Sequence, residues 1–253
     1  MMEKETTVNM DRFEAAILDM DGVITRTARA HAAAWKKMFD DYLAERSERE
    51  GKGYLPFDDR EDYYRYVDGK PRYDGVRSFL ESREVHLPFG HPGDPPGFET
   101  VCGLGNRKNG YFLKHIEEKG VEVYESTTDF VERMKNMNRG VAVISSSRNA
   151  RAVLEAAGVR ELFPVIVDGV DMAERNIAGK PAPDIFLEAA GQLRVAPDAA
   201  MVIEDAQSGV EAGRAGGFAL VIGIDRSGSN PGLSSSGADI VVSDLSDIKL
   251  RGE

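Results

Sequence analysis

Cysteine is nearly absent from this chain, and long apolar runs are absent altogether. The single cysteine, Cys102, excludes an intramolecular disulfide, and we expect it to act as a small apolar residue. No apolar run is long enough to cross a bilayer, and residues 1–7 lack the basic and then apolar pattern of a secretory signal. We therefore expect a cytoplasmic protein without a membrane partner.

Basic residues are also in short supply. Lys and Arg total 32 against 43 Asp and Glu, so the formal net charge is −11. Nucleic acids and anionic membranes are bound by basic surfaces, so neither is an expected partner. The 253 residues exceed the ~100–200 residues of a typical domain, which predicts one large domain or two unequal ones.

The most informative segment is the apolar run 15–18, which ends at Asp19-Met20-Asp21-Gly22. Such a run is typical of a buried parallel strand, and open α/β sheets bind ligands at the carboxyl ends of their strands. Asp19 and Asp21 would share one face of the extended chain. Two close carboxylates repel unless a cation or a proton lies between them, so the pair predicts a divalent metal and acid/base chemistry. An ordinary turn is the alternative interpretation.

The segments after this strand are mostly helical up to residue 119. Thr27 is a candidate cap for a helix over 28–44, in which Trp35, Met38 and Phe39 recur at helical spacing. Further helices are predicted over 59–67, 73–84 and 106–119. The proline-rich stretch 87–97 is predicted to be a long loop.

From residue 125 onward, strand and helix patterns alternate. The predicted elements cover 141–144, 150–157, 165–167, 183–193, 200–203, 208–215, 219–222 and 240–242. This alternation indicates a doubly wound, Rossmann-like α/β fold with a parallel sheet. We expect a core of residues 1–25 and 125–253, with a helical cap domain of residues 26–124 inserted between them.

Three later segments carry further candidate site residues. A predicted strand ends at Ser145, and the segment that follows, Ser146, Ser147, Arg148 and Asn149, offers hydroxyls, amides and a guanidinium to a phosphate. A polar turn capped by Asn149 is the alternative. Lys180 precedes a predicted helix and could reach a phosphate, although a lone lysine is usually a surface charge. Glu204 and Asp205 end another apolar strand as metal ligands or as helix-capping acids.

In this order, the segments resemble the haloacid dehalogenase superfamily of phosphoryl-transfer enzymes over nearly the whole chain. The resemblance rests on four motifs: Asp19 to Val23, Ser145, Lys180, and Glu204 with Asp205. It implies that Asp19 is a nucleophile that becomes an aspartyl phosphate and that Asp21 is the general acid/base. It also implies Mg²⁺ on Asp19, on the Asp21 carbonyl and on Asp205, with Glu204 as a ligand directly or through water.

Within that superfamily, the chain resembles the β-phosphoglucomutase family. The candidate site residues carried by this closer resemblance are Thr27, His31 and Trp35 on the hinge and first cap helix, Gly69 and Arg72 in a cap loop, Lys108 on a later cap helix, and Ser145 to Asn149. It implies that His31 couples cap closure to Asp21 and that Arg72 holds a distal phosphate. Arg26, Ser146 and Ala206 depart from the family pattern, and the cap is longer around 45–58 and 85–105.

The resemblance therefore implies a mutase that interconverts β-D-glucose 1-phosphate and glucose 6-phosphate through a bisphosphate intermediate. The alternative is a Mg²⁺-dependent sugar-phosphate phosphatase of the same fold, and a binding protein without turnover is a third reading. The cap residues favour the mutase because a phosphatase has less need of a second phosphate site. The expected partner is a small phosphosugar, and the expected assembly is a monomer or a weak dimer.

Overall fold

The computed structural model describes residues 6–226, 228, 230 and 232–252. The chain divides into two compact units. The first, here called the α/β unit, contains Met1–Arg26 and Val121–Glu253, and the second, the helical unit, contains Thr27–Gly120. The chain thus leaves the α/β unit after its first 26 residues and returns to it at residue 121.

A six-stranded parallel sheet organises the α/β unit, in the strand order β4-β3-β2-β5-β6-β7. Its strands are β2 (Ala15–Asp19), β3 (Gly140–Ile144), β4 (Val165–Val167), β5 (Ala200–Glu204), β6 (Leu220–Ile224) and β7 (Ile240–Val242). All residues of β2 and β5 are buried, as expected for central strands covered on both faces. Because the strands are parallel, Asp19 and Glu204, the last residues of β2 and β5, lie at the same edge of the sheet.

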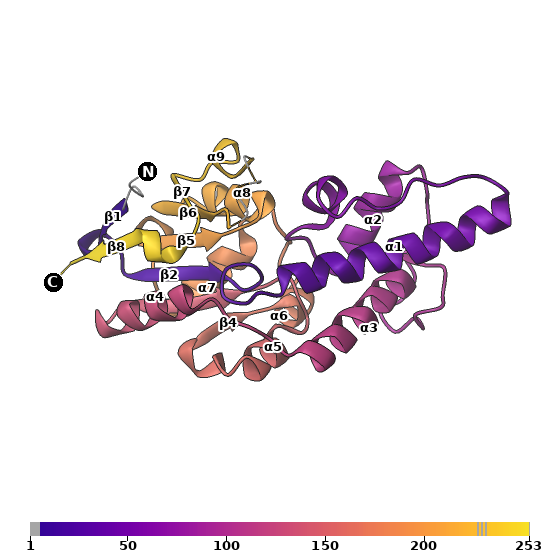
Figure 1. Ribbon diagram of the computed structural model, residues 1–253. Helices are drawn as coiled ribbons and strands as arrows, with labels where there is room; N and C mark the ends of the chain where they lie inside the picture. Colours follow the sequence, from indigo (N-terminus) through magenta and orange to yellow (C-terminus); the bar gives the residue numbers. More distant parts are fainter. Residues whose placement is uncertain (1–5, 227, 229, 231, 253) are drawn as a thin grey trace. The chain divides into compact units, whose positions relative to one another are not determined.

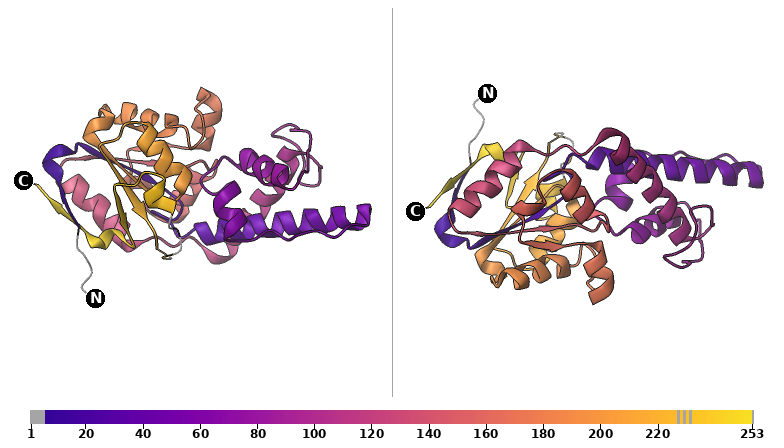
Figure 2. Two further views of the ribbon diagram at one scale, coloured as in Figure 1. Left: turned by 90° about the horizontal axis from the view of Figure 1, so that it is seen from above. Right: turned by 90° about the horizontal axis from the view of Figure 1, so that it is seen from below.

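Helices cover both faces of this sheet (Figures 1 and 2). They are α4 (Glu125–Asn136), α5 (Ala150–Ala156), α6 (Gly169–Arg175), α7 (Asp184–Leu193), α8 (Gln207–Ala215) and α9 (Gly232–Ser235). Helix α7 packs on β2, β3 and β4, and α8 packs on β5 and β6. One apolar cluster joins Ile17 of β2 with Phe186 of α7 and Val210 of α8. The predicted doubly wound architecture is confirmed.

The helical unit has its own apolar core. It contains α1 (Ala28–Glu50), a π-helical turn (Tyr63–Val67), α2 (Arg72–Ser82) and α3 (Val101–Lys119). Phe39 of α1 stacks on Phe57 and on Trp35, and it packs against Phe79 with the two rings tilted by 46°. Aromatic packing therefore joins the helices of this unit to one another.

Several predicted boundaries were wrong in the helical unit. Helix α1 continues six residues beyond residue 44, because polar residues with an Arg46–Glu50 ion pair extend it without an apolar repeat. Helix α3 starts at Val101, where the Thr100 hydroxyl accepts a hydrogen bond from the Gly103 amide at 2.9 Å. The predicted helix over 59–67 is mainly the π-helical turn.

Helices α4 and α9 were not predicted, and neither were three further short elements of the α/β unit. Strands β1 (Thr6–Asn9) and β8 (Ile248–Arg251) form a separate parallel pair. Helix α6 begins with a capping box between Asp168 and Asp171. These three elements are short, and the two strands lie about as far apart in sequence as the chain allows, so no local pattern signals their pairing.

The predicted loop over 87–97 is confirmed, and the segment without helix or strand extends from residue 85 to residue 100. Side-chain hydrogen bonds hold this loop in place. The Asp94 carboxylate accepts a hydrogen bond from the Thr100 hydroxyl at 2.7 Å, and the Asn106 side-chain amide donates to the carbonyls of Pro92 and Asp94 at 3.0 and 2.8 Å. Among the described residues, no helix is both long enough and apolar enough to span a bilayer.

The carboxyl of Asp244, just after β7, makes the stability of the α/β unit depend on pH in the acid range. Although partial burial acts to raise it, hydrogen bonds from Ser126, Ser246 and Arg226 lower the pKa of Asp244 to about 2. A carboxyl with a lowered folded-state pKa stabilises the fold above its unfolded value and loses that contribution as the pH falls through the folded value. We expect Asp244→Asn to lower the free energy of unfolding near pH 7 and to flatten its fall between pH 4 and pH 2, roughly the window between the two pKa values. Urea unfolding of both proteins across that range measures this, and parallel pH profiles would contradict it.

Candidate active site

Lys180 joins two carboxylates at the carboxyl edge of the sheet. Its ammonium donates to Asp19 Oδ1 at 2.5 Å and also to Glu204 Oε1. All three side chains are nearly inaccessible: Lys180 is 1 %, Asp19 9 % and Glu204 0 % exposed. The second Glu204 oxygen accepts a hydrogen bond from the Ala206 amide at 2.8 Å, so both oxygens of this carboxylate are held.

Charge is not balanced in this cluster. Burial alone would lower the pKa of Lys180, but attraction by Asp19 and Glu204 raises it, so the ammonium stays charged. Burial raises the pKa of Asp19 well above its ordinary value despite the opposing effect of Lys180. One buried ammonium therefore serves two carboxylates, which leaves a surplus of negative charge.

Asp205 adds a third carboxylate beside this pair. Oxygen atoms of Asp19, Glu204 and Asp205 all lie within 4.8 Å of one another. A set of hard oxygen donors with surplus negative charge suits a divalent cation such as Mg²⁺ or Ca²⁺. The residues present thus fit a metal at this edge of the sheet.

The Asp205 carboxylate occupies the position that a side chain at residue 22 would need, so residue 22 must be glycine. A Cβ atom built on Gly22 would lie 1.7 Å from Asp205 Oδ2, and the φ angle of Gly22 is +84°. Both the backbone conformation and the close approach require glycine here. The Gly22 amide donates to the Thr25 carbonyl at 2.8 Å, which closes the turn that follows Asp21.

We expect Gly22→Ala to displace the Asp205 carboxylate and to weaken Mg²⁺ binding. Gly217→Ala is the matched control, because Gly217 also has a positive φ, +71°, but nothing lies within 4 Å of its Cβ position. Both variants should lose about 1–2 kcal/mol of stability from backbone strain, but only Gly22→Ala should lose cation affinity. Titration calorimetry with Mg²⁺ measures the difference, and equal affinities in the two variants would show that the Gly22 contact is irrelevant to the cluster.

Ser145 connects the segment after β3 to Asp21. Its hydroxyl donates to Asp21 Oδ2 at 3.3 Å and accepts from the Ser147 amide at 3.0 Å. The Ser147 hydroxyl in turn accepts from the Asn149 amide at 3.2 Å. Ser146 and Ser147 are partly exposed and Arg148 is exposed. Asn149 precedes α5, but its side chain makes no capping hydrogen bond, so the simple capping alternative is wrong.

In the helical unit, the side chains of His31 and Lys108 contact each other and pack against aromatic rings. Lys108 Nζ lies 2.6 Å from His31 Nδ1, and an ammonium can only donate, so Nδ1 is the acceptor and the imidazole proton is on Nε2. The ammonium also lies 4.9 Å from the Trp35 ring and 5.1 Å from the Phe112 ring. Trp35 is only 4 % exposed and belongs to the apolar core of this unit.

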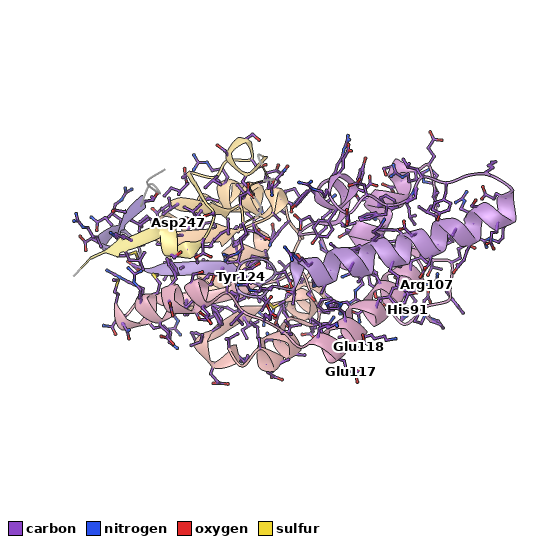
Figure 3. All side chains as sticks on the ribbon, viewed as in Figure 1. His91, Arg107, Glu117, Glu118, Tyr124 and Asp247 are labelled. Carbon is purple, nitrogen blue, oxygen red and sulfur yellow. The ribbon has the colours of Figure 1, made fainter. Side chains whose placement is uncertain are left out.

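Arg72 belongs to a second polar group of the helical unit. Its guanidinium donates to Asn109 Oδ1 at 2.9 Å and to Asn106 Oδ1 at 3.4 Å. The Tyr73 hydroxyl also donates to Asn106 Oδ1, at 3.0 Å. Sequence reasoning missed Asn106, although its spacing from Asn109 on α3 places both on one helix face. His91 lies within the loop of residues 85–100, and Arg107 of α3 donates to the Pro96 carbonyl of that loop at 3.0 Å; both residues are labelled in Figure 3.

The remaining two predicted residues lie at the ends of short connections in the helical unit. Gly69 has a φ of +68° in the turn before α2. Thr27 is buried and precedes α1, but its side chain makes no capping hydrogen bond there, contrary to the expectation. The α/β unit therefore gathers Asp19, Asp21, Ser145, Lys180, Glu204 and Asp205, and the helical unit forms the His31 and Arg72 groups.

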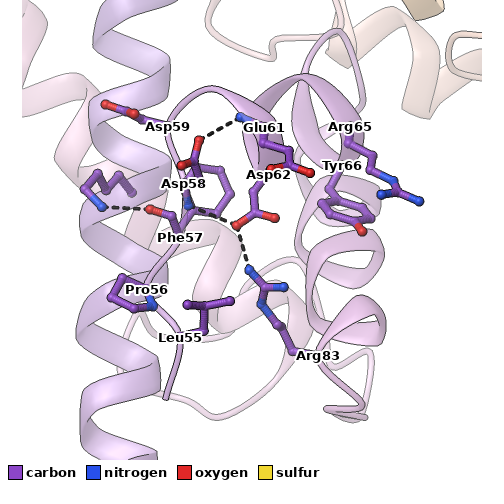
Figure 4. Close-up of a pocket in the computed structure, with 11 residues that line it drawn as sticks. Leu55, Pro56, Phe57, Asp58, Asp59, Glu61, Asp62, Arg65, Tyr66 and Arg83 are labelled. Carbon is purple, nitrogen blue, oxygen red and sulfur yellow. Dashed lines mark hydrogen bonds and ion pairs between the residues drawn. The ribbon is translucent and has the colours of Figure 1, made fainter. Parts of the chain in front are cut away.

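A cavity of about 540 Å³ in the helical unit contains none of these residues. Figure 4 shows its lining, with Asp62 between the Asp58 amide and Arg83. Asp62 Oδ2 lies 2.9 Å from that amide nitrogen and 2.7 Å from Arg83 Nη2. Asp62 and Arg83 therefore pair with each other, and the lining also carries the charged side chains of Lys36, Asp59, Glu61 and Arg65.

Three comparisons with known proteins agree with this geometry. The family model for haloacid dehalogenase-like hydrolase matches residues 13–217. The chain is 52 % identical to a β-phosphoglucomutase of Mycobacterium tuberculosis, over 94 % of this chain and 92 % of that protein. It is 34 % identical to the β-phosphoglucomutase of Bacillus subtilis, over 94 % and 92 % respectively. A crystal structure of β-phosphoglucomutase from Clostridium difficile matches with a TM-score of 0.73 and 26 % identity, over 94 % of this chain and 93 % of that one.

Proposed function

The chain belongs to the haloacid dehalogenase-like family, in its β-phosphoglucomutase group, and from this we propose that it interconverts β-D-glucose 1-phosphate and glucose 6-phosphate. The observation that carries the proposal is the pairing of a buried Asp19–Lys180–Glu204 cluster with extensive identity to β-phosphoglucomutases. The cluster supplies a nucleophile and a cation site, and the identity extends through the helical unit, whose residues would select the sugar.

In the first half-reaction, an oxygen of Asp19 attacks phosphorus of the bisphosphorylated sugar. The bond between phosphorus and the sugar oxygen breaks, and Asp21 donates a proton to that oxygen. In the second half-reaction, Asp21 takes the proton from a hydroxyl of the incoming sugar phosphate, which attacks the aspartyl phosphate and regenerates Asp19. Ser145, which donates to Asp21 Oδ2, would keep this carboxyl oriented through both steps.

Asp19, Asp205, Glu204 and the Asp21 carbonyl would hold Mg²⁺. When bound, the cation neutralises the phosphoryl oxygens that otherwise repel an attacking carboxylate. Lys180 assists by pairing with Asp19 and Glu204, so that the remaining negative charge can face the cation and the phosphate. Ser145 to Asn149 would bind the phosphate being transferred through hydroxyls and amides.

The helical unit would bind the rest of the substrate. Arg72, held by Asn106 and Asn109, presents a guanidinium suited to a distal phosphate, with Gly69 shaping the adjoining turn. Lys108 and His31 offer an ammonium and an imidazole to sugar oxygens, and Trp35 supports Lys108 from the apolar core. Thr27 lies where the chain enters the helical unit and would take part in coupling substrate binding to chemistry.

Phosphorus NMR tests this function directly. The protein would be incubated with Mg²⁺ and β-glucose 1-phosphate, primed with a trace of glucose 1,6-bisphosphate, and α-glucose 1-phosphate would serve as the anomer control. Conversion of the β anomer alone to glucose 6-phosphate is expected. Release of inorganic phosphate would instead support the phosphatase alternative, and absence of either product would contradict the proposed substrate.

A further inference from the structure

Arg226, two residues beyond the end of β6, reaches the backbone that follows Asp21. Its Nε donates to the Gly22 carbonyl at 3.1 Å and its Nη2 to the Val23 carbonyl at 3.3 Å, while Nη1 pairs with Asp244. The side chain is only 18 % exposed. Because β5 separates β6 from β2 in the sheet, these contacts join segments that follow two strands that are not neighbours.

Two residues of the returning chain complete the surroundings of this guanidinium. The Tyr124 ring centre lies 3.4 Å from the Arg226 Cζ atom, so the two planar groups are stacked. Thr127 donates from its hydroxyl to the Val23 carbonyl at 2.7 Å, and Arg226 Nη2 lies 3.4 Å from the same hydroxyl. Tyr124 is labelled in Figure 3, and its amide donates to the Ile24 carbonyl at 2.9 Å.

These contacts stabilise the turn of residues 20–25, which also has backbone hydrogen bonds of its own. Within it, the Gly22 amide bonds to the Thr25 carbonyl and the Ile24 and Thr25 amides bond to the Met20 carbonyl, at 2.8–2.9 Å. Within the part of the chain that the structure describes, the carbonyls of Gly22 and Val23 accept no backbone hydrogen bond inside the turn, and Arg226 donates to both. A guanidinium suits this task because its planar fork can donate to several acceptors at once, whereas an ammonium is a point charge on a flexible stem.

We propose that Arg226 is a positioning residue for phosphoryl transfer, which acts by holding the backbone that carries Asp21. The proposal rests on the proposed function for its kinetic consequences, but the structural part does not depend on it. Phosphoryl transfer depends on alignment of the carboxyl with the reacting oxygen, and a displacement of the supporting backbone lowers the rate without removing any reacting group.

The experiment compares the wild type with Arg226→Ala, Arg226→Lys and the control Arg214→Ala. Arg214 lies in the same unit and pairs with Asp239, but makes none of the contacts to the turn, so the control removes an equal charge. Hydrogen exchange of the amides of residues 20–25 reports on the turn without any need for activity. Thermal unfolding, kcat and KM are measured on the same preparations.

We expect Arg226→Ala to speed exchange in the turn by at least ~10-fold and to lower kcat by ~10–100-fold, with KM changed far less. Free guanidinium should restore part of kcat in Arg226→Ala, and Arg226→Lys should fall between that variant and the wild type. Arg214→Ala should leave exchange and kcat near wild-type values. If Arg226→Ala does not fold, exchange and kcat of Arg226→Lys decide the matter.

Unchanged amide hydrogen exchange in the turn of Arg226→Ala would overturn the proposal. Faster exchange together with a wild-type kcat would also overturn it. A loss of kcat that only follows the folded fraction and that guanidinium does not restore would also overturn it. If the wild type itself showed no mutase turnover, the proposed function would fail while the exchange data still decided whether Arg226 holds the turn.

Discussion

Replacing Asp19 by asparagine is expected to abolish phosphoryl transfer while leaving the fold intact. The amide has nearly the same shape as the carboxylate but is a far poorer nucleophile, so kcat should fall by roughly 10⁴-fold or more. The fold should tolerate the change because Lys180 keeps its pairing with Glu204 and because burial already raises the pKa of Asp19 and disfavours its charged form.

Single-turnover formation of the aspartyl phosphate measures this most directly, together with steady-state mutase activity. Asp198→Asn is the matched control, since Asp198 is an exposed acid in a 3₁₀ turn before β5 and loses the same charge. Turnover by Asp19→Asn within tenfold of the control would mean that another group accepts the phosphoryl group, and the proposed covalent mechanism would then be wrong.

The sheet was predictable from sequence because its strands are buried on both faces. Continuous apolar runs such as those of β4 and β5 have no competing helical or loop interpretation when glycine, proline or acidic residues bound them. The boundaries of α1 and α3 were not predictable to the same degree, since polar residues extend the first and a side-chain cap from Thr100 starts the second. The ends of these helices are set by side-chain ion pairs and caps, and such interactions leave only a weak pattern in the sequence.

The residues at the sheet edge were predictable for a geometric reason. Parallel strands end together, so any polar residue directly after an apolar run is brought to one edge, as Asp19, Ser145 and Glu204 are. Asn106 and Arg226 gave no such signal. Each acts mainly through hydrogen bonds to backbone carbonyls, and an arginine or asparagine that will bind a distant carbonyl has the same local sequence as one that faces water.

Replacing Lys180 by methionine should have the largest effect on stability. The change leaves Asp19 and Glu204 buried side by side without their cation, and removal of one partner from a buried ion pair costs about 3–5 kcal/mol. Loss of the ammonium also removes the attraction that lowers the pKa of Asp19, so the nucleophile would hold its proton more tightly and kcat should fall as well.

Urea unfolding at pH 7.5 measures the stability loss, and a second substitution identifies its cause. Glu204→Gln in the Lys180→Met background removes one of the two abandoned charges, so it should recover part of the lost free energy, whereas Glu204→Gln in the wild type should recover none. The sign of this coupling separates electrostatics from packing. If methionine simply packed poorly, a neutral side chain at position 204 would not help. Recovery of the free energy of unfolding would instead mean that the main role of the Lys180 ammonium is to allow two carboxylates to be buried together. A phosphate and a cation can then bind at that site.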